Sequence, residues 1–168
     1  DLAAEAQAFA EQCPIGGQTI HTGATSADIT DNADALIIRQ ALELVRLRLA
    51  NLLRAYEQRI SEVYQERLVA LGFTHIQPAQ PVPLAYRLAN HAQDLLRVLW
   101  QLEGFQIEGK GTKGAVGTGA DYTTMLDGTG VSFLEFHERV MQKLDLPALT
   151  VTGQTATRLV DVEYMNIL

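Results

Sequence analysis

Residues 33–71 read ADALIIRQALELVRLRLANLLRAYEQRISEVYQERLVAL, and this stretch decides the fold. It contains no glycine or proline, and apolar residues recur at heptad spacing at Leu42, Leu49, Tyr56 and Val63. The spacing predicts one long helix, on the order of 55–60 Å at ~1.5 Å per residue. A helix of that length with one apolar stripe cannot be buried inside a small globule. We therefore expect an all-α fold, an elongated bundle of long helices, with some partner helices supplied by other subunits.

Signals on both sides of this stretch set the expected boundaries. Asp31 is expected to cap the helix, Asp34 suits its first turn, and Gly72 is expected as its C-cap. The remaining pattern predicts helices over 2–12, 81–105, 133–144 and 158–168, an extended proline-rich connector over 73–83, a glycine-rich loop over 109–119 and a β-favouring run over 149–152.

Composition narrows the class of protein. The chain has 168 residues, 47% of them hydrophobic and 20% charged, which suits a globular domain and excludes disorder. No apolar run approaches the ~20 residues of a membrane span, and no secretory signal is present, so we expect a soluble, cytoplasmic protein with no membrane partner. The net charge of −7, with scattered Lys and Arg, argues against nucleic acid as a partner. The single cysteine, Cys13, is expected to be a small buried residue.

Both ends of the sequence look cut. The chain begins without Met inside a helical pattern, and residues 161–168 stop without a capping signal. We therefore expect an internal fragment of a longer protein.

Three short stretches carry the polar groups that chemistry needs: residues 21–28, 74–81 and 152–158. Each lies at an expected helix end, where free N–H groups and the helix dipole favour an anion such as a carboxylate or phosphate. Simpler interpretations stay open, because Thr25 and Ser26 could only cap a helix, Gln154 could cap the last helix, and His75 could be an ordinary loop histidine. Two prolines restrict the backbone near His75, which favours a proton-transfer role.

Other candidate sites are weaker. His91 and His137 lie within predicted helices, where a structural role is favoured, and His21 is intermediate. The glycine spacing 109, 111 and 114 imitates a dinucleotide fingerprint, but no strand is predicted before it. The sequence contains neither an HExxH nor a CxxC pattern, so it indicates no metal site.

Four motifs together resemble the adenylosuccinate lyase family of the fumarase/aspartase superfamily. They are IHTGATSAD at residues 20–28 with Asp31-Asn32, LGFTHIQPAQ at 71–80, KGAVGT at 113–118, and VTGQT at 151–155 with Arg158 and residues 160–163. The resemblance covers essentially the whole chain. It implies a central bundle of long helices, a homotetramer with a twenty-helix core, and active sites each built from three subunits.

The resemblance also implies a reaction and the residues for it. The reaction is β-elimination of fumarate from adenylosuccinate, giving AMP, and from the succinylated aminoimidazole carboxamide ribotide of purine biosynthesis, with no metal or organic cofactor. His75 aligns with the catalytic histidine, assigned as general acid toward the leaving nitrogen. The aligned substrate-binding residues are Thr25 and Ser26 at the succinyl carboxylate, Thr74 beside them, Gln154, and Asp1 as the last residue of an Arg-His-Asp triplet.

The resemblance divides the chain into 1–19, the end of an N-terminal helical region, and 20–168, part of the central bundle domain. Two departures matter. Residues 81–85 read PVPLA where the family has hydroxyl residues and glycine, and the family's Gly-Ser-Ser-x-Met-Pro-x-Lys-x-Asn loop with its general-base serine does not occur. We therefore expect this chain alone to be inactive. Two alternatives stay open: another superfamily lyase that releases fumarate from a different substrate, and a non-catalytic helical assembly module.

Overall fold

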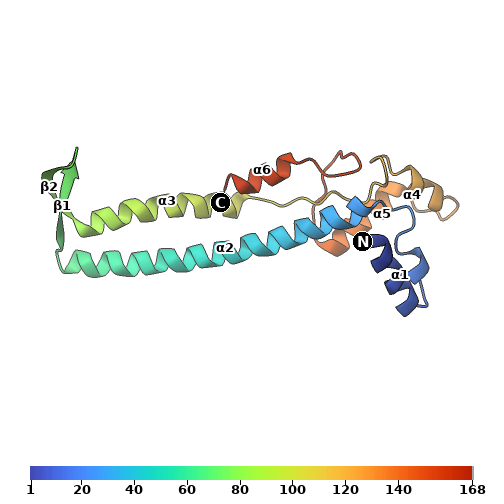
Figure 1. Ribbon diagram of the computed structural model, residues 1–168, viewed down its shortest axis with the longest axis horizontal. Helices are drawn as coiled ribbons and strands as arrows, with labels where there is room; N and C mark the ends of the chain where they lie inside the picture. The colour runs from blue at the N-terminus through green and yellow to red at the C-terminus, as the bar shows by residue number, and fades with distance from the viewer. Residues whose placement is uncertain (168) are drawn as a thin grey trace. The chain divides into compact units, whose positions relative to one another are not determined.

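The computed structural model describes residues 1–167, which are mostly helical with one two-stranded sheet (Figure 1). In chain order the elements are α1 (Leu2–Gln12), the short 3-10 helix η1 (Gly17–Thr19), α2 (Ser26–Gln65), β1 (Val69–Thr74), β2 (Gln77–Pro83), α3 (Leu84–Gly104), α4 (Ala120–Met125), α5 (Phe133–Leu144) and α6 (Leu159–Met165). The chain forms two compact units. The first comprises Asp1–Arg39 and Gln106–Glu163, and the second comprises Gln40–Phe105 with the end of the chain from Tyr164.

The predicted long helix is confirmed, but both of its ends were placed wrongly. Helix α2 has 40 residues and begins at Ser26, so Asp31 lies inside the helix and does not cap it. Its other end is a Schellman motif and not Gly72. Arg67 adopts a left-handed backbone with φ 53°, its N–H donates to the Tyr64 carbonyl at 3.1 Å, and the Leu68 N–H donates to the Val63 carbonyl at 3.1 Å.

The segment predicted as an extended connector is a β-hairpin, so a small two-stranded sheet accompanies the mostly helical fold. Strands β1 and β2 pair antiparallel, with Val69 opposite Pro83 and Thr74 opposite Gln77, and the register shifts between Leu71 and Phe73 (Figure 1). Prolines are tolerated because both strands of a two-stranded sheet are edges. Strand β2 runs to Pro83, so α3 starts at Leu84 and not near residue 81.

The first unit has a small apolar core between the start of α2 and α5. Ala35, Met141 and Leu146 are buried there, and Leu36, Ile107, Leu144 and Ala148 pack around them. The ring of Tyr122 in α4 stacks on Phe133 of α5 with centroids 6.1 Å apart, and packs at a tilt against Phe136 with centroids 5.2 Å apart. This packing holds the glycine-rich loop, residues 109–119, against the first turns of α2.

The predicted bounds were correct for two of the shorter helices and wrong for other segments. The bounds of α1 and α5 are those predicted, whereas α4 was not predicted. Residues 149–152 form no strand; the only pairing nearby in the described chain is a parallel bridge between Gly109 and Ala148. Helix α6 is shorter than predicted, and Leu168 lies outside the described residues. Cys13 is half-buried and its thiol donates to the Ile15 carbonyl, so the expectation of full burial was wrong.

None of the described helices combines the length and the apolar character that a membrane crossing requires.

Candidate functional site

The first turn of α2 is organised by one buried carboxylate, that of Asp28. Its Oδ2 accepts the Thr25 N–H at 3.1 Å, which satisfies one of the free donors at this helix end. The side chain is 1% exposed. Because Thr25 immediately precedes the helix, the bond fixes the backbone of the Thr25–Ser26 pair.

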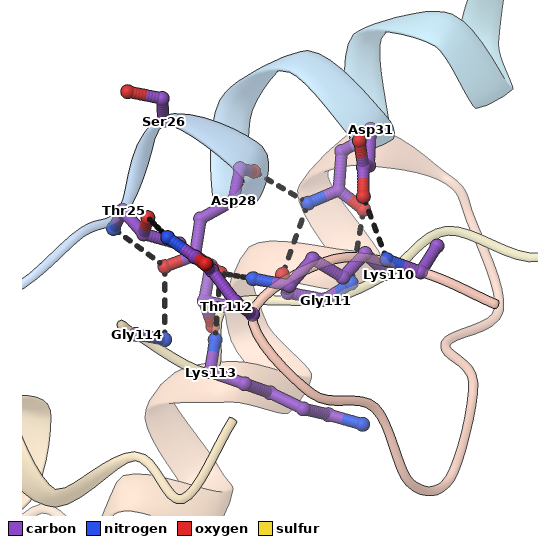
Figure 2. A network of polar contacts seen from close by, with 12 residues as sticks. Thr25, Ser26, Asp28, Asp31, Lys110, Gly111, Thr112, Lys113 and Gly114 are labelled. Atoms are coloured by element: carbon purple, nitrogen blue, oxygen red, sulfur yellow. Dashed lines mark hydrogen bonds and ion pairs between the residues drawn. The ribbon is translucent and has the colours of Figure 1, made fainter. Parts of the chain in front are cut away.

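The glycine-rich loop surrounds the other faces of the same carboxylate (Figure 2). Oδ1 accepts the Lys113 N–H at 3.0 Å and the buried Lys110 ammonium, while Oδ2 accepts the Gly114 N–H at 2.9 Å and the Tyr122 hydroxyl at 3.3 Å. Burial raises the pKa of the Asp28 carboxyl, but the bond from Lys110 and three main-chain N–H donors together lower it below its ordinary 3.8. The carboxylate is therefore ionised at neutral pH.

Two further contacts tie this loop to the helices behind it. The Asn32 amide donates to the Gly111 carbonyl at 3.1 Å, and its oxygen accepts the Gly111 N–H at 3.0 Å. His137 of α5 is buried, and its Nδ1 accepts the Thr112 N–H at 3.3 Å. Burial, and then the charge of Lys113, lower the pKa of His137. His137 thus has the structural role that its helical position indicates.

Lys113 connects the loop to the segment that precedes Gln154. Its side chain is buried, and its ammonium donates to the carbonyls of Leu149 and of Thr150, the latter at 3.0 Å. Burial, with the charge of Lys110 second, lowers the pKa of Lys113.

Two of the predicted substrate-binding residues meet in space. The Gln154 amide nitrogen lies 3.5 Å from the Thr25 hydroxyl, although 129 residues separate them in sequence. Gln154 does not cap α6, which begins only at Leu159. Asp31 contributes from inside α2, since its Oδ2 accepts the Ala156 N–H at 2.7 Å. Figure 2 shows the Ser26 side chain directed away from the buried carboxylate.

Two buried polar atoms in the same two segments have no hydrogen-bond partner within the described chain. They are Nε2 of His21, a few residues before Thr25, and Oγ1 of Thr152, just before Gln154. Buried polar groups are normally paired, so unpaired ones beside exposed hydroxyl and amide groups suit a surface that binds a polar ligand.

The other predicted site residues belong to other segments of the chain. Thr74 and His75 belong to the second unit, at the end of β1 and in the hairpin turn, and both are exposed. His75 therefore lies in a tight turn with φ 47°, not on an extended connector. Asp1 caps α1, where its Oδ1 accepts the Ala3 N–H at 2.7 Å. Of the predicted set, the first unit thus brings Thr25 and Gln154 together, with Ser26 next to Thr25.

Within residues 1–167 no group of three or more His, Cys, Asp or Glu side chains could hold a metal ion.

Sequence reasoning missed the buried polar residues that support this site: Asp28, Asn32, Lys110, Lys113 and Tyr122. Two signals could have found them. Asp28 stands three residues after Thr25, the spacing at which an acidic side chain bonds back to the cap N–H. The two lysines stand among glycines in a loop, which favours a close backbone approach.

A family model described as lyase matches residues 5–163. The curated adenylosuccinate lyase of Saccharomyces cerevisiae is 35% identical over 171 residues, and that of Schistosoma mansoni is 34% identical over 172. The adenylosuccinate lyase of Pyrococcus horikoshii is 33% identical over 171 residues. These alignments cover 98–100% of this chain but 34–36% of each relative, so the chain spans about a third of their length.

Solved structures show the same fold. A fumarate lyase from Mesorhizobium sp. BNC1 superposes with a TM-score of 0.79 at 25% identity, covering 96% of this chain and 36% of that one. A 3-carboxy-cis,cis-muconate lactonizing enzyme from Pseudomonas putida superposes with a TM-score of 0.81 at 24% identity, covering 98% and 36%.

Proposed function

The chain belongs to the lyase family, and from this premise we propose that the protein carrying it eliminates fumarate from adenylosuccinate and from the matching succinylated carboxamide ribotide. The curated relatives named adenylosuccinate lyase, at 33–35% identity over nearly the whole chain, support this choice of substrate. Under this proposal the protein acts in purine biosynthesis and in the cytoplasm.

The observation that carries the proposal is the meeting of Thr25 and Gln154. A hydroxyl and an amide from two distant segments lie 3.5 Å apart, beside the N-terminal end of α2. The helix dipole and these donors favour a carboxylate there, and a succinyl group carries two carboxylates. Ser26 and Asp1 complete the proposed set of substrate-binding residues.

The reaction needs a base, an anion site and an acid. The base takes a proton from the carbon beside a carboxylate, and fixed donors hold the resulting negative charge. The C–N bond then breaks, the electron pair left on carbon forms the double bond of fumarate, and the departing nitrogen takes a proton from the acid. We assign the anion site to Thr25, Ser26 and Gln154. We assign protonation of the departing nitrogen to His75, with Thr74 beside it.

His75 belongs to the second unit, whereas Thr25 and Gln154 belong to the first. We propose that the site forms in a homotetramer, with the His75 hairpin supplied by another copy of the chain. Exposed apolar side chains in the second unit support association: Leu44, Leu47 and Trp100 are 54%, 51% and 61% exposed.

The test of the acid is His75→Ala in the protein that carries this chain. Fumarate release from adenylosuccinate, followed by ultraviolet absorbance, should fall by about 10²–10⁴ in kcat if His75 transfers the proton. His91→Ala, an exposed histidine on α3, is the matched control and should leave kcat unchanged. An effect of His75→Ala below about tenfold would refute the acid role.

One feature favours a second candidate, a lyase that releases fumarate from another succinylated compound. Residues 81–85 depart from the family pattern, and residues 81–83 form the end of β2, the strand that follows the turn carrying His75. A panel of succinylated substrates separates the two, since fumarate release from a different member of the panel, and none from adenylosuccinate, would replace the first proposal.

A further inference from the structure

The direct contact between Thr25 and Gln154 is weak. Their one direct hydrogen bond, at 3.5 Å, is at the outer limit of such bonds and lies in an exposed position. Other contacts must fix the distance between Thr25 and Gln154, because a substrate that binds both residues requires this distance to be constant.

Lys113 is bonded to both segments at once. Its main-chain N–H donates to Asp28 Oδ1 at 3.0 Å, and Asp28 in turn accepts the Thr25 N–H at 3.1 Å through its other oxygen. Its ammonium donates to the carbonyls of Leu149 and Thr150, the latter at 3.0 Å. Gln154 follows four residues after Thr150.

We infer that Lys113 is a positioning residue, which sets the spacing between Thr25 and Gln154 by holding the first segment with its backbone and the second with its ammonium. The kinetic consequence rests on the function proposed above. The structural claim does not.

The chemistry of the side chain suits this task. Leu149 and Thr150 lie outside any helix or strand, so their two neighbouring carbonyls lack the partners that regular structure supplies. An ammonium has three donors and can bond both carbonyls together, whereas an apolar side chain of equal length would leave both unpaired. Lys113 is 7% exposed, so water cannot readily replace it.

Two other contacts hold the far side of the same segment. Asp31 Oδ2 accepts the Ala156 N–H at 2.7 Å. Gly117 packs against Gly153, where an added Cβ would come within 2.8 Å of the Gly153 carbonyl oxygen. Residues 149–156 are thus held at both ends, and Lys113 provides the hold nearer the buried Asp28 carboxylate.

The test replaces Lys113 by methionine in the protein that carries this chain. Methionine has nearly the same length and removes every donor, while the Lys113 N–H to Asp28 remains. Amide hydrogen exchange of residues 149–156 should accelerate by at least about tenfold, with the α2 amides unchanged. The KM for adenylosuccinate should rise by about tenfold or more with a smaller change in kcat, because His75 is untouched.

Controls keep the outcomes distinct. Lys143→Met, an exposed lysine near the end of α5, should change neither measurement. Lys113→Gln keeps two of the three donors on a shorter side chain and should give an intermediate effect. It carries the test if the methionine variant does not fold. Unchanged exchange over residues 149–156 in the Lys113 variants overturns the inference. If the wild type releases no fumarate from adenylosuccinate, the proposed function fails, and the exchange measurement still decides the role of Lys113.

Discussion

Replacing Asp28 by asparagine removes one buried charge and leaves the shape of the side chain almost unchanged. In the structure Oδ1 accepts from the Lys110 ammonium and the Lys113 N–H, and Oδ2 accepts from the N–H groups of Thr25 and Gly114. Asparagine keeps one acceptor oxygen. In either amide orientation its NH₂ group therefore faces at least two donors, and the buried ammonium loses its counter-charge.

The magnitude follows from these contacts. Each buried donor left without an acceptor costs about 1–3 kcal/mol. Removing one partner of a buried ion pair costs about 3–5 kcal/mol in total, since the two effects overlap. A folded domain is stable by only about 5–15 kcal/mol, so the substitution should remove a large share of the free energy of unfolding.

The assay is urea denaturation of the protein that carries this chain, followed by circular dichroism at fixed protein concentration. Glu135→Gln, which breaks the exposed pair with Arg139, is the control and should cost less than about 0.5 kcal/mol. Adding Lys110→Met to Asp28→Asn should recover at least about 1 kcal/mol, because the uncompensated charge is gone. A loss below about 1 kcal/mol for Asp28→Asn alone would show that this network does not hold the fold.

Gly117 has a φ of +83°, and replacing it by alanine would push a methyl group against the Thr152 carbonyl oxygen. The KM for adenylosuccinate should therefore rise by at least about tenfold. Gly16→Ala is the control, because Gly16 is also left-handed but an added Cβ there meets nothing within 4 Å, and it should leave KM unchanged. Because burial and the charge of Lys113 lower the folded-state pKa of His137, the unfolded chain takes up that proton at higher pH than the folded one. The contribution of neutral His137 to the free energy of unfolding should be complete above pH 6.5 and should decline as the pH falls toward the lowered pKa. Urea midpoints of the His137→Gln variant should lose this pH dependence. The same decline of the midpoint with falling pH in the variant would contradict the assignment.

Local signals predicted some elements well. Helix α5 begins where expected because Ser132 caps it by accepting the Glu135 N–H, and α1 ends where Pro14 follows. The length of α2 was foreseen from an uninterrupted apolar stripe. The end of α2 was not predicted, because Arg67 ends the helix in a left-handed conformation, which glycine usually adopts at this position.

The hairpin was missed for a related reason. Pairing of β1 with β2 depends on partners several residues apart, and prolines in β2 argue against a strand when the sequence is viewed locally. The turn residues are His75 and Ile76, and neither is a glycine or an asparagine, the residue types that usually mark such a turn.

The candidate site divides in the same way. Thr25 and Gln154 were chosen from motif resemblance, and the structure brings them together. The residues beneath them were not chosen, since charged side chains are expected at the surface and only the folded chain shows Lys110 and Asp28 fully enclosed.

The hairpin turn at His75 and Ile76 is subject to two opposing kinds of selection. Both residues hold a positive φ, 47° and 69°, and a left-handed backbone costs about 1–2 kcal/mol for each residue that carries a Cβ. Glycine at either position would relax the loop and make the hairpin easier to form. An imidazole at the turn can exchange a proton with a bound molecule, and glycine cannot. Under the proposed acid role, selection for turnover favours histidine at this turn, whereas selection for stability favours glycine.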